Sequence, residues 1–136
     1  MRTKIRSKGL KHIGGQNMKL PIKFSKEGPN GWLAAQNKPL ETAKLVSGKA
    51  VGLDHIYYKN NSPSVQAGIW RSSPYTEFYE EYPCDEFMYI IEGSVTIEAD
   101  NFKATYCKEE AFLLPKGFQG YWKQEEPMLK YYVIIG

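Results

Sequence analysis

The sequence predicts an all-β fold, in which antiparallel strands form a sandwich or barrel of about eight or more strands. Three observations support this prediction. From Val51 onward the chain consists of short runs rich in Val, Ile, Tyr and Phe, which are residues that favour strands. Turn residues recur between these runs at the spacing typical of sandwiches and barrels. No helical pattern of useful length separates the runs, which excludes parallel βαβ units.

The expected strands follow one another with short turns. The runs "VGLDHIYYKN" and "SVQAGIWRSS" are separated by "NSP" and are predicted to form a hairpin. The runs "DEFMYIIEG" and "SVTIEAD" meet at the tight-turn pair Glu92-Gly93, and Asp100-Asn101 marks the next turn. The remaining strand-like runs are "FKATYCKE", "AFLLP", "GYWKQ" and "MLKYYVIIG". Residues 27–50 contain several Gly and Pro breakers, which predict an irregular lead-in with one short helical turn around Glu41–Leu45.

The length of 136 residues predicts one domain. We expect this domain to span residues 27–136, with its barrel core at 51–136, and residues 1–26 to form a basic, flexible segment. All 15 acidic residues lie at or after Glu27, whereas eight of the 18 basic residues precede it. The basic residues are interleaved with Gly, Ile and Asn, which favours a loosely attached tail over a nucleic-acid-binding arm. The stretch "MKLPIKF" resembles a translation start, so a further hypothesis is that the native protein begins at Met18.

Composition also limits the location and the partners. No apolar run reaches the length of about 18 residues that a membrane span requires. The N-terminus carries charge without the apolar stretch of a secretory signal. Cys84 and Cys107 have no metal-binding spacing, which is typical of two reduced thiols in a cytoplasmic protein. We therefore expect a cytoplasmic protein with neither a membrane nor a nucleic acid as its partner.

Alternation along the strands predicts which side chains share a face, because successive residues of a strand point to opposite sides of the sheet. Three such sets carry polar or aromatic residues that share a face: Glu86 with Met88 and Ile90, Gly120 with Trp122 and Gln124, and Lys130 with Tyr132 and Ile134.

Two motifs resemble those of the cupin superfamily. The first is Glu86 followed after six residues by Gly93, and the second is the Pro-x-Gly turn at 115–117. Together with Trp70, the Gly-x-Trp at 120–122 and Lys130, they are similar to the single-domain branch that includes ureidoglycine-aminohydrolase-type and ethanolamine-utilisation-type cupins. The resemblance implies a double-stranded β-helix, or jelly-roll barrel, mostly antiparallel, that encloses a small-molecule pocket.

The sequence departs from the metal-binding cupin pattern. Cupins that hold a metal carry two histidines shortly before the motif glutamate and a third histidine after the Pro-x-Gly turn. Here the first two positions fall on Tyr79 and Glu81, or on Glu80 and Tyr82, and the third position is Gly120. The nitrogen ligands that a transition metal prefers are therefore missing from both motifs.

The remaining residues offer a weak oxygen site at most. His12 and His55 lie outside both motifs, and His55 is expected to be structural. Glu81, Glu86 and Gln124 are the oxygen donors left near the motifs, and three such ligands suit only a weakly held divalent cation. We therefore predict no cofactor and no histidine-bound metal, and the weak divalent site stays open.

The predicted pocket is aromatic with a single carboxylate. The resemblance implies that Glu86 and Gly120 point into the barrel, and alternation places Trp122 beside Gly120. Trp122 is expected to fill part of the space that the missing imidazole leaves. Such a pocket suits a small polar or cationic ligand. Its predicted members are Trp70, Tyr79, Glu81, Tyr82, Met88, Phe112, Gly120 and Trp122.

Glu86 and Lys130 are the candidate catalytic residues. A rim or surface position fits Lys130 equally well, and Glu86 could instead be a buried structural residue that backbone donors satisfy. If Glu86 is catalytic, two alternatives are open for its chemistry. Burial beside Trp122 and Met88 would raise the pKa of Glu86 and suit general acid–base catalysis. An inward-facing Lys130 would instead pair with Glu86, lower that pKa and make the pair a fixed dipole. Cys84 is a weaker candidate for a nucleophile, because no base is identified beside it.

Two classes of function are compatible with these features. The first is an enzyme that acts on a small polar or nitrogen-containing metabolite by acid–base chemistry without the usual metal. The second is a non-catalytic cupin that binds or senses a ligand, or serves as an accessory protein. In either case we expect a homodimer, because small barrels have unpaired edge strands.

Overall fold

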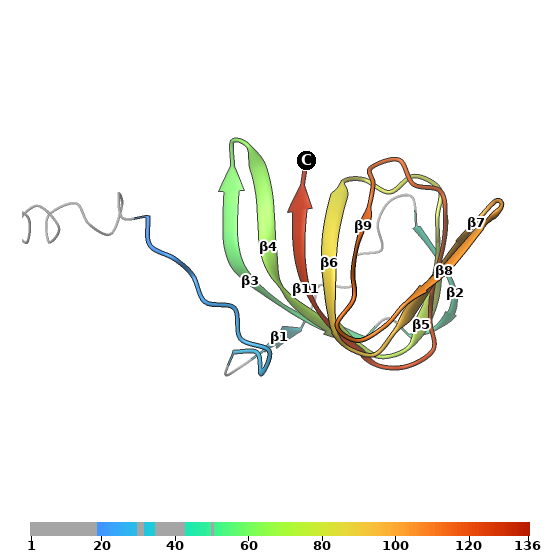
Figure 1. The fold of residues 1–136 in the computed structure, drawn as a ribbon, viewed down its shortest axis with the longest axis horizontal. Helices are drawn as coiled ribbons and strands as arrows, with labels where there is room; N and C mark the ends of the chain where they lie inside the picture. Colours follow the sequence, from blue (N-terminus) through green and yellow to red (C-terminus); the bar gives the residue numbers. More distant parts are fainter. Residues whose placement is uncertain (1–18, 30–31, 35–42, 50) are drawn as a thin grey trace, which may run out of the picture.

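The computed structural model describes residues 19–29, 32–34, 43–49 and 51–136, and their strands form two sheets (Figure 1). The six-stranded sheet has the order β1-β3-β4-β11-β6-β9, and the five-stranded sheet has the order β2-β5-β10-β7-β8. Every pairing among these strands is antiparallel, so the all-β, antiparallel prediction is confirmed. The strands are β1 (Leu33–Ala34), β2 (Ala43–Gly48), β3 (Gly52–Asn61), β4 (Ser64–Ser72), β5 (Tyr75–Tyr79), β6 (Asp85–Glu92), β7 (Val95–Ala99), β8 (Phe102–Tyr106), β9 (Ala111–Leu114), β10 (Gly120–Gln124) and β11 (Met128–Ile135).

The turns lie where the sequence predicts them. Strands β3 and β4 form a hairpin around Ser62-Pro63. Gly93 has a φ of 89°, a left-handed conformation that glycine adopts without steric cost, and it joins β6 to β7. Asn101 has a φ of 58° in the turn between β7 and β8, and asparagine tolerates this region better than most residues.

Three strands differ from the prediction. β1 and β2 lie in the segment predicted to be irregular, and residues 43–45 are extended rather than helical, while residues 41 and 42 lie outside the described residues. The physical reason is pairing: β2 forms an edge ladder with β5, from Ala43 opposite Tyr79 to Gly48 opposite Tyr75. β5 itself is not among the strands that the sequence predicts. No helix long and apolar enough to cross a membrane occurs in the described part of the chain.

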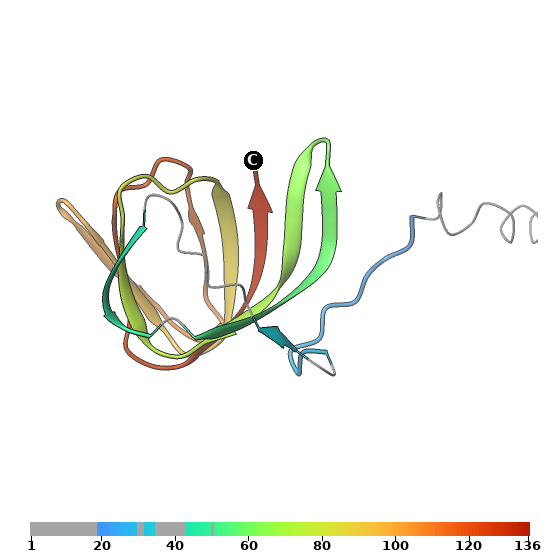
Figure 2. The same cartoon turned by 180° about the vertical axis from the view of Figure 1, so that it is seen from behind.

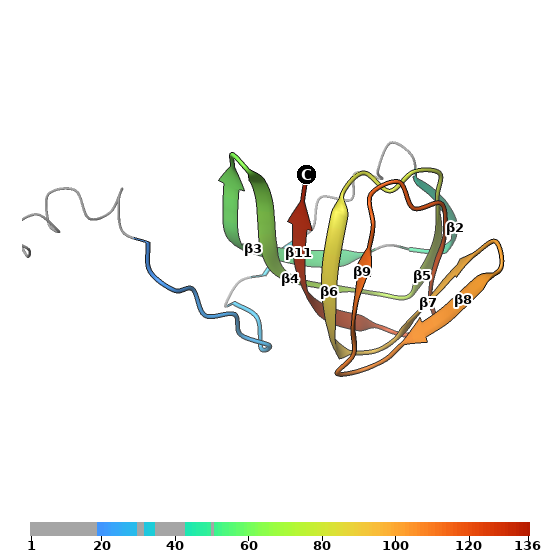
Figure 3. The same cartoon turned by 45° about the horizontal axis from the view of Figure 1, so that its top comes forward.

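The core lies between the two sheets. Figures 2 and 3 show the β3–β4 hairpin at one side of the molecule and β2, β5, β7 and β8 at the other, with β6 and β9 between them. Alternation along β6 is as predicted: Met88 and Ile90 are fully buried, whereas Phe87 between them is 46% exposed. Trp122 of β10 completes this core from the opposite sheet. The same alternation turns polar side chains of β6 and β11 inward.

Candidate functional site

A buried ion pair lies at the centre of the barrel. Glu86 of β6 and Lys130 of β11 both face inward, and Nζ of Lys130 lies 2.7 Å from Oε2 of Glu86. The residues are only 4% and 6% exposed. Of the two alternatives left open by the sequence, the structure shows the paired arrangement. Pairing matters here because an isolated charge at this depth would lose most of its solvation.

Two tryptophans surround the ammonium group. Nζ of Lys130 lies 4.8 Å from the ring centroids of both Trp70 of β4 and Trp122 of β10. The two indoles meet almost at right angles, with an interplanar angle of 87°. The sulfur of Met88 lies 3.0 Å from the same nitrogen. Indole faces attract cations through their quadrupole, so this cage helps to compensate the lost hydration of the ammonium.

Tyr82 binds the other oxygen of the carboxylate. Its hydroxyl donates to Oε1 of Glu86 at 2.5 Å. Burial, together with the negative charge of Glu86, raises the pKa of Tyr82 well above its usual value, so its phenol stays a proton donor. The ring of Tyr79 packs edge-on against Tyr82, with centroids 4.8 Å apart. Tyr82, Glu86 and Lys130 thus form one continuous hydrogen-bonded chain, called here the central chain.

Gln124 holds Trp122 in place. Its amide oxygen accepts the indole N–H of Trp122 at 3.0 Å, and its amide nitrogen lies within hydrogen-bond distance of Oγ of Ser72 and of the carbonyl of Glu126. Gln124 is 2% exposed. These bonds fix the indole that forms one wall of the cage.

The oxygen donors considered for a weak divalent site are not gathered in one place. Glu81 is exposed, whereas Glu86 and Gln124 are buried and occupied by the partners described above. The described residues contain no group of three or more His, Cys, Asp or Glu side chains that could hold a metal ion.

Phe118, rather than Trp122, takes up the space beside Gly120. A Cβ atom built on Gly120 would lie 2.6 Å from the ring of Phe118 and 2.5 Å from the carbonyl oxygen of Glu98. The indole instead stacks toward Tyr75 and packs against the Lys130 ammonium. The side chain nearest to a Cβ at Gly120 thus comes from the loop before β10.

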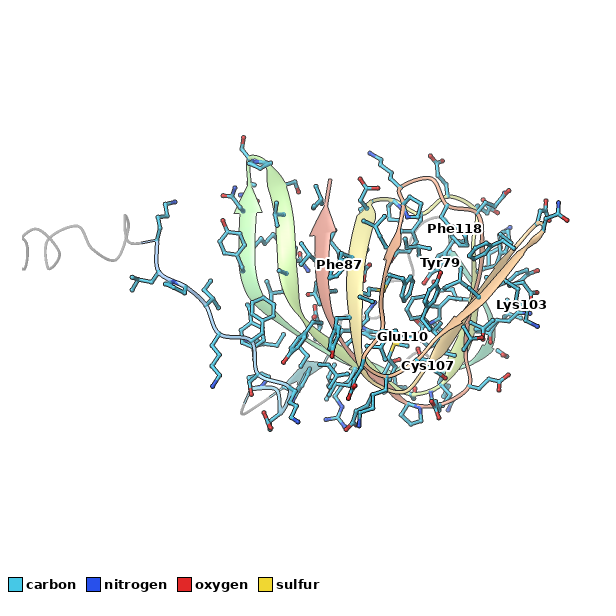
Figure 4. The ribbon with its side chains drawn as sticks, viewed as in Figure 1. Tyr79, Phe87, Lys103, Cys107, Glu110 and Phe118 are labelled. Carbon is cyan, nitrogen blue, oxygen red and sulfur yellow. The ribbon has the colours of Figure 1, made fainter. Side chains whose placement is uncertain are left out.

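Backbone hydrogen bonds join the loop between β5 and β6 to the loop between β9 and β10. The backbone N–H of Tyr82 donates to the carbonyl of Phe118 at 2.9 Å, and the N–H of Gly117 donates to the carbonyl of Tyr82 at 2.7 Å. Figure 4 shows Phe118 and Tyr79 close to these loops, and Cys107 and Glu110 toward the other end. Tyr82 therefore connects the loop before β10 to the central chain.

The other predicted pocket residues also line the core. Phe112 stacks on Tyr106, with centroids 4.0 Å apart, and Met88 is fully buried. Cys84 is buried too, and desolvation together with the nearby charge of Glu86 raises the pKa of its thiol to about 11. A thiol protonated at neutral pH is a poor nucleophile, which argues against the catalytic role considered for Cys84.

One polar cluster is absent from the sequence-based prediction. The hydroxyl of Tyr132 donates to Oδ1 of Asp54 at 2.8 Å, and Nε2 of Gln66 donates to the Tyr132 hydroxyl at 3.3 Å. Burial raises the pKa of Asp54, opposed mainly by the Tyr132 hydrogen bond. Alternation along β11 places Tyr132 on the same face as Lys130, but nothing local connects it to Asp54 on β3.

A groove of about 770 Å³ lies away from these groups. It is lined by Leu53, Arg71 and Met128 among others, and none of the central-chain residues lines it. This groove is therefore separate from the buried polar centre.

Comparison with known proteins agrees with this architecture. The EutQ protein of Clostridium difficile is 20% identical, with a TM-score of 0.55 over 84% of this chain and 80% of that chain. A protein of unknown function of the DUF861 family from Pseudomonas syringae is 17% identical, with a TM-score of 0.71 over 82% of this chain and 46% of that chain. A structure from Salmonella typhimurium, described as an ethanolamine utilization protein Q, is 12% identical, with a TM-score of 0.56 over 77% of this chain and 97% of that chain.

These likenesses show the cupin fold, so the predicted cupin-type barrel is confirmed. The chain spans less than half of the Pseudomonas protein. No curated protein matches it. The family model described as "EutQ-like cupin domain" matches residues 60–132, which is more than half of the chain. The protein therefore belongs to the EutQ-like cupin domain family.

Proposed function

We propose that this cupin binds a small polar metabolite in its barrel and acts on it by acid–base chemistry, without a histidine-bound metal. The observation that carries the proposal is the central chain, in which Tyr82 donates a hydrogen bond to Oε1 of Glu86 and Lys130 donates one to Oε2. A carboxylate between two proton donors can pass a proton from one to the other, which is the basis of general acid–base catalysis.

The cage also restricts the ligand. The ammonium of Lys130 already occupies the position over both indoles where a ligand cation would bind, and it neutralises Glu86. A cationic ligand at this point would meet the like charge of the ammonium, so the cage favours a neutral polar group. The hydroxyl of Tyr82 is the neutral polar group of the central chain, and such a ligand would compete with Glu86 for its proton.

Turnover of a panel of small polar metabolites tests the proposal, with wild type compared with Glu86→Gln. The exchange keeps the shape of the side chain and removes its proton-accepting carboxylate, so the rate should fall by about a hundredfold or more. Glu92→Gln is the matched control, because Glu92 is an exposed glutamate of the same strand. Equal rates for wild type and Glu86→Gln would remove Glu86 from the mechanism.

A non-catalytic ligand-binding or sensor role is the second candidate. Its support is the burial of Glu86 and Lys130, at 4% and 6% exposure, behind loops that are tied by two backbone hydrogen bonds. Such a pair stabilises the barrel without meeting a substrate. Under this alternative, thermal-shift screening should find metabolites that raise the melting temperature while none of them is turned over.

Either role is compatible with a homodimer, which we propose from the outer apolar face. This face is formed by Tyr58, Phe87, Leu113, Val133 and Ile135, and four of these side chains are 44–54% exposed. Cross-strand pairing joins Phe87 to both Leu113 and Val133, so the face is continuous. A contiguous apolar patch of this kind is typical of an interface.

The described N-terminal segment supplies a complementary surface. Phe24 stacks on Tyr57, with centroids 4.5 Å apart, while Leu20 and Ile22 are 68% and 46% exposed. We propose that these two side chains of one copy cover the outer apolar face of a second copy.

We also propose a cytoplasmic location. The free thiols Cys84 and Cys107 support it, because thiols stay reduced in that compartment.

A further inference from the structure

The cluster of Asp54, Gln66 and Tyr132 occupies the inner face of the six-stranded sheet, next to the central chain. Asp54 of β3 pairs with Trp70 of β4, and Trp70 pairs with Lys130 of β11, so these three residues form one row across the sheet. In the next row Tyr132 lies opposite Gly68. Alternation then turns Asp54 toward the same interior as Lys130.

Gly68 explains how Tyr132 and Asp54 meet across an intervening strand. A Cβ atom built on Gly68 would lie 2.9 Å from the hydroxyl of Tyr132. The tyrosine therefore lies over the glycine and reaches β3, where its hydroxyl binds Asp54. A side chain at position 68 would block this path. The cluster is thus a built feature of three strands and not a chance surface contact.

The cluster has unused hydrogen-bond acceptors. A carboxylate can accept about four hydrogen bonds, and Asp54 receives one from Tyr132 and one from the backbone amide of His55. The amide oxygen of Gln66 accepts no hydrogen bond from the described residues, since this side chain contacts Tyr132 through its nitrogen. Both side chains are only half-buried, so these acceptors remain open to solvent or to a ligand.

The charge of Asp54 is also unmatched. Within the described ranges it has no ion-pair partner, because the nearby ammonium of Lys130 is bound to Glu86. Burial raises the pKa of Asp54, because it removes water from the charged form. A half-buried carboxylate without a cation gains most from a charged N–H donor, especially one that offers two parallel N–H groups.

We propose that Asp54, Gln66 and Tyr132 form a second anchoring site in the barrel, for a ligand group that carries paired N–H donors, such as an amidine, a guanidine or a primary amide. The site is independent of the central chain, because the ligand group pairs with Asp54 and the cage around Lys130 stays as it is. A ligand anchored here extends along the sheet toward Trp70 and Lys130.

The test uses the full chain, labelled with nitrogen-15, and three probes of nearly the same shape. Acetamidinium carries charged N–H donors, acetamide carries neutral ones, and acetate carries none. Backbone amide shifts of His55 and Ala67, which flank the cluster, should move saturably with acetamidinium, less with acetamide, and not with acetate. Asp54→Asn should weaken acetamidinium binding by about tenfold or more.

Two further variants sharpen the result. Gln66→Glu adds a second carboxylate and should tighten acetamidinium binding, which no loss of folding can imitate. Asp100→Asn, in the exposed turn after β7, is the matched control and should bind like wild type. The proposal is overturned by the absence of a saturable shift with acetamidinium, by equal affinity in Asp54→Asn, or by equal binding of acetate. These outcomes are read from binding alone, so they are distinct from the turnover test of Glu86.

Discussion

Nζ of Lys130 lies 2.7 Å from Oε2 of Glu86, although the two residues are 44 positions apart in the chain. The pair is enclosed by the indoles of Trp70 and Trp122, and Tyr82 binds the second carboxylate oxygen. A positive charge carried by the chain itself thus stands beside the motif glutamate of this cupin. This arrangement makes several properties of the protein predictable.

Removing the ammonium should leave a buried, unpaired carboxylate. Lys130→Met should therefore lower the free energy of unfolding by about 3–5 kcal/mol. The double variant Glu86→Gln/Lys130→Met should recover most of this loss, because it also removes the unpaired carboxylate of Glu86. Urea unfolding followed by tryptophan fluorescence measures both. Lys103→Met is the control, since that side chain is 70% exposed, and a loss in Lys130→Met no larger than in this control would contradict the prediction.

Gly120 should tolerate no side chain. A Cβ atom there would lie 2.5 Å from the backbone carbonyl of Glu98, so Gly120→Ala should cost about 1–3 kcal/mol of stability. Adding Phe118→Leu should relieve only the ring contact and rescue the variant in part. Gln119→Ala at the exposed neighbouring position is the control. Unfolding curves that coincide for wild type and Gly120→Ala would refute the close contact.

The stability contribution of Asp54 should fall as pH rises. Burial raises its pKa, so the folded protein holds this proton more tightly than the unfolded chain does. The contribution is complete below the ordinary pKa of about 4 and is lost as pH passes through the raised value. Relative to Asp54→Asn, wild type should therefore lose stability as pH rises above about 4. Urea unfolding of both proteins at several pH values gives this difference, and a slope of the opposite sign would argue against it.

The two thiols should react at different rates. The pKa of Cys84 is raised to about 11 by burial and by neighbouring carboxylates, whereas Cys107 is exposed. Iodoacetamide near neutral pH should label Cys107 and spare Cys84, because the thiolate is the reactive form. The raised pKa also means that this group contributes stability below about pH 9 and loses it as pH rises toward 11. Peptide mass spectrometry reads the labelling, and equal modification of both residues in the folded protein would exclude the buried thiol.

The outer apolar face should carry the proposed dimer contact. Phe87→Lys places a charge within this face and should convert the dimer to a monomer in light scattering. Phe102→Lys is the matched control, because Phe102 is similarly exposed, at 48%, but lies on β8 of the other sheet. A wild-type protein that is monomeric at high concentration would exclude the dimer.

Most strands could be predicted because alternation is a local property. Met88 and Ile90 face the core while Phe87 faces outward, and this alternation is visible in the order of neighbouring residues. β2 lacks such a signal because nearly all of its residues are exposed, so it is extended only through its pairing with β5. An edge strand of this kind has no hydrophobic pattern to detect, and its conformation depends on hydrogen bonds to a distant segment.

The same distinction applies to the site. Alternation and the resemblance indicated that Glu86 and Trp122 point into the barrel, but they left the direction of Lys130 open. They could not decide whether Glu86 is paired, because this depends on the register of β6 against β11. Nor could they join Tyr132 to Asp54 across Gly68, or place Phe118 beside Gly120. The sequence alone determined which side chains of a strand share a face, since this follows from the period of a strand. Only the tertiary structure decided which of them meet, because register and loop packing are set by contacts between segments far apart in the chain.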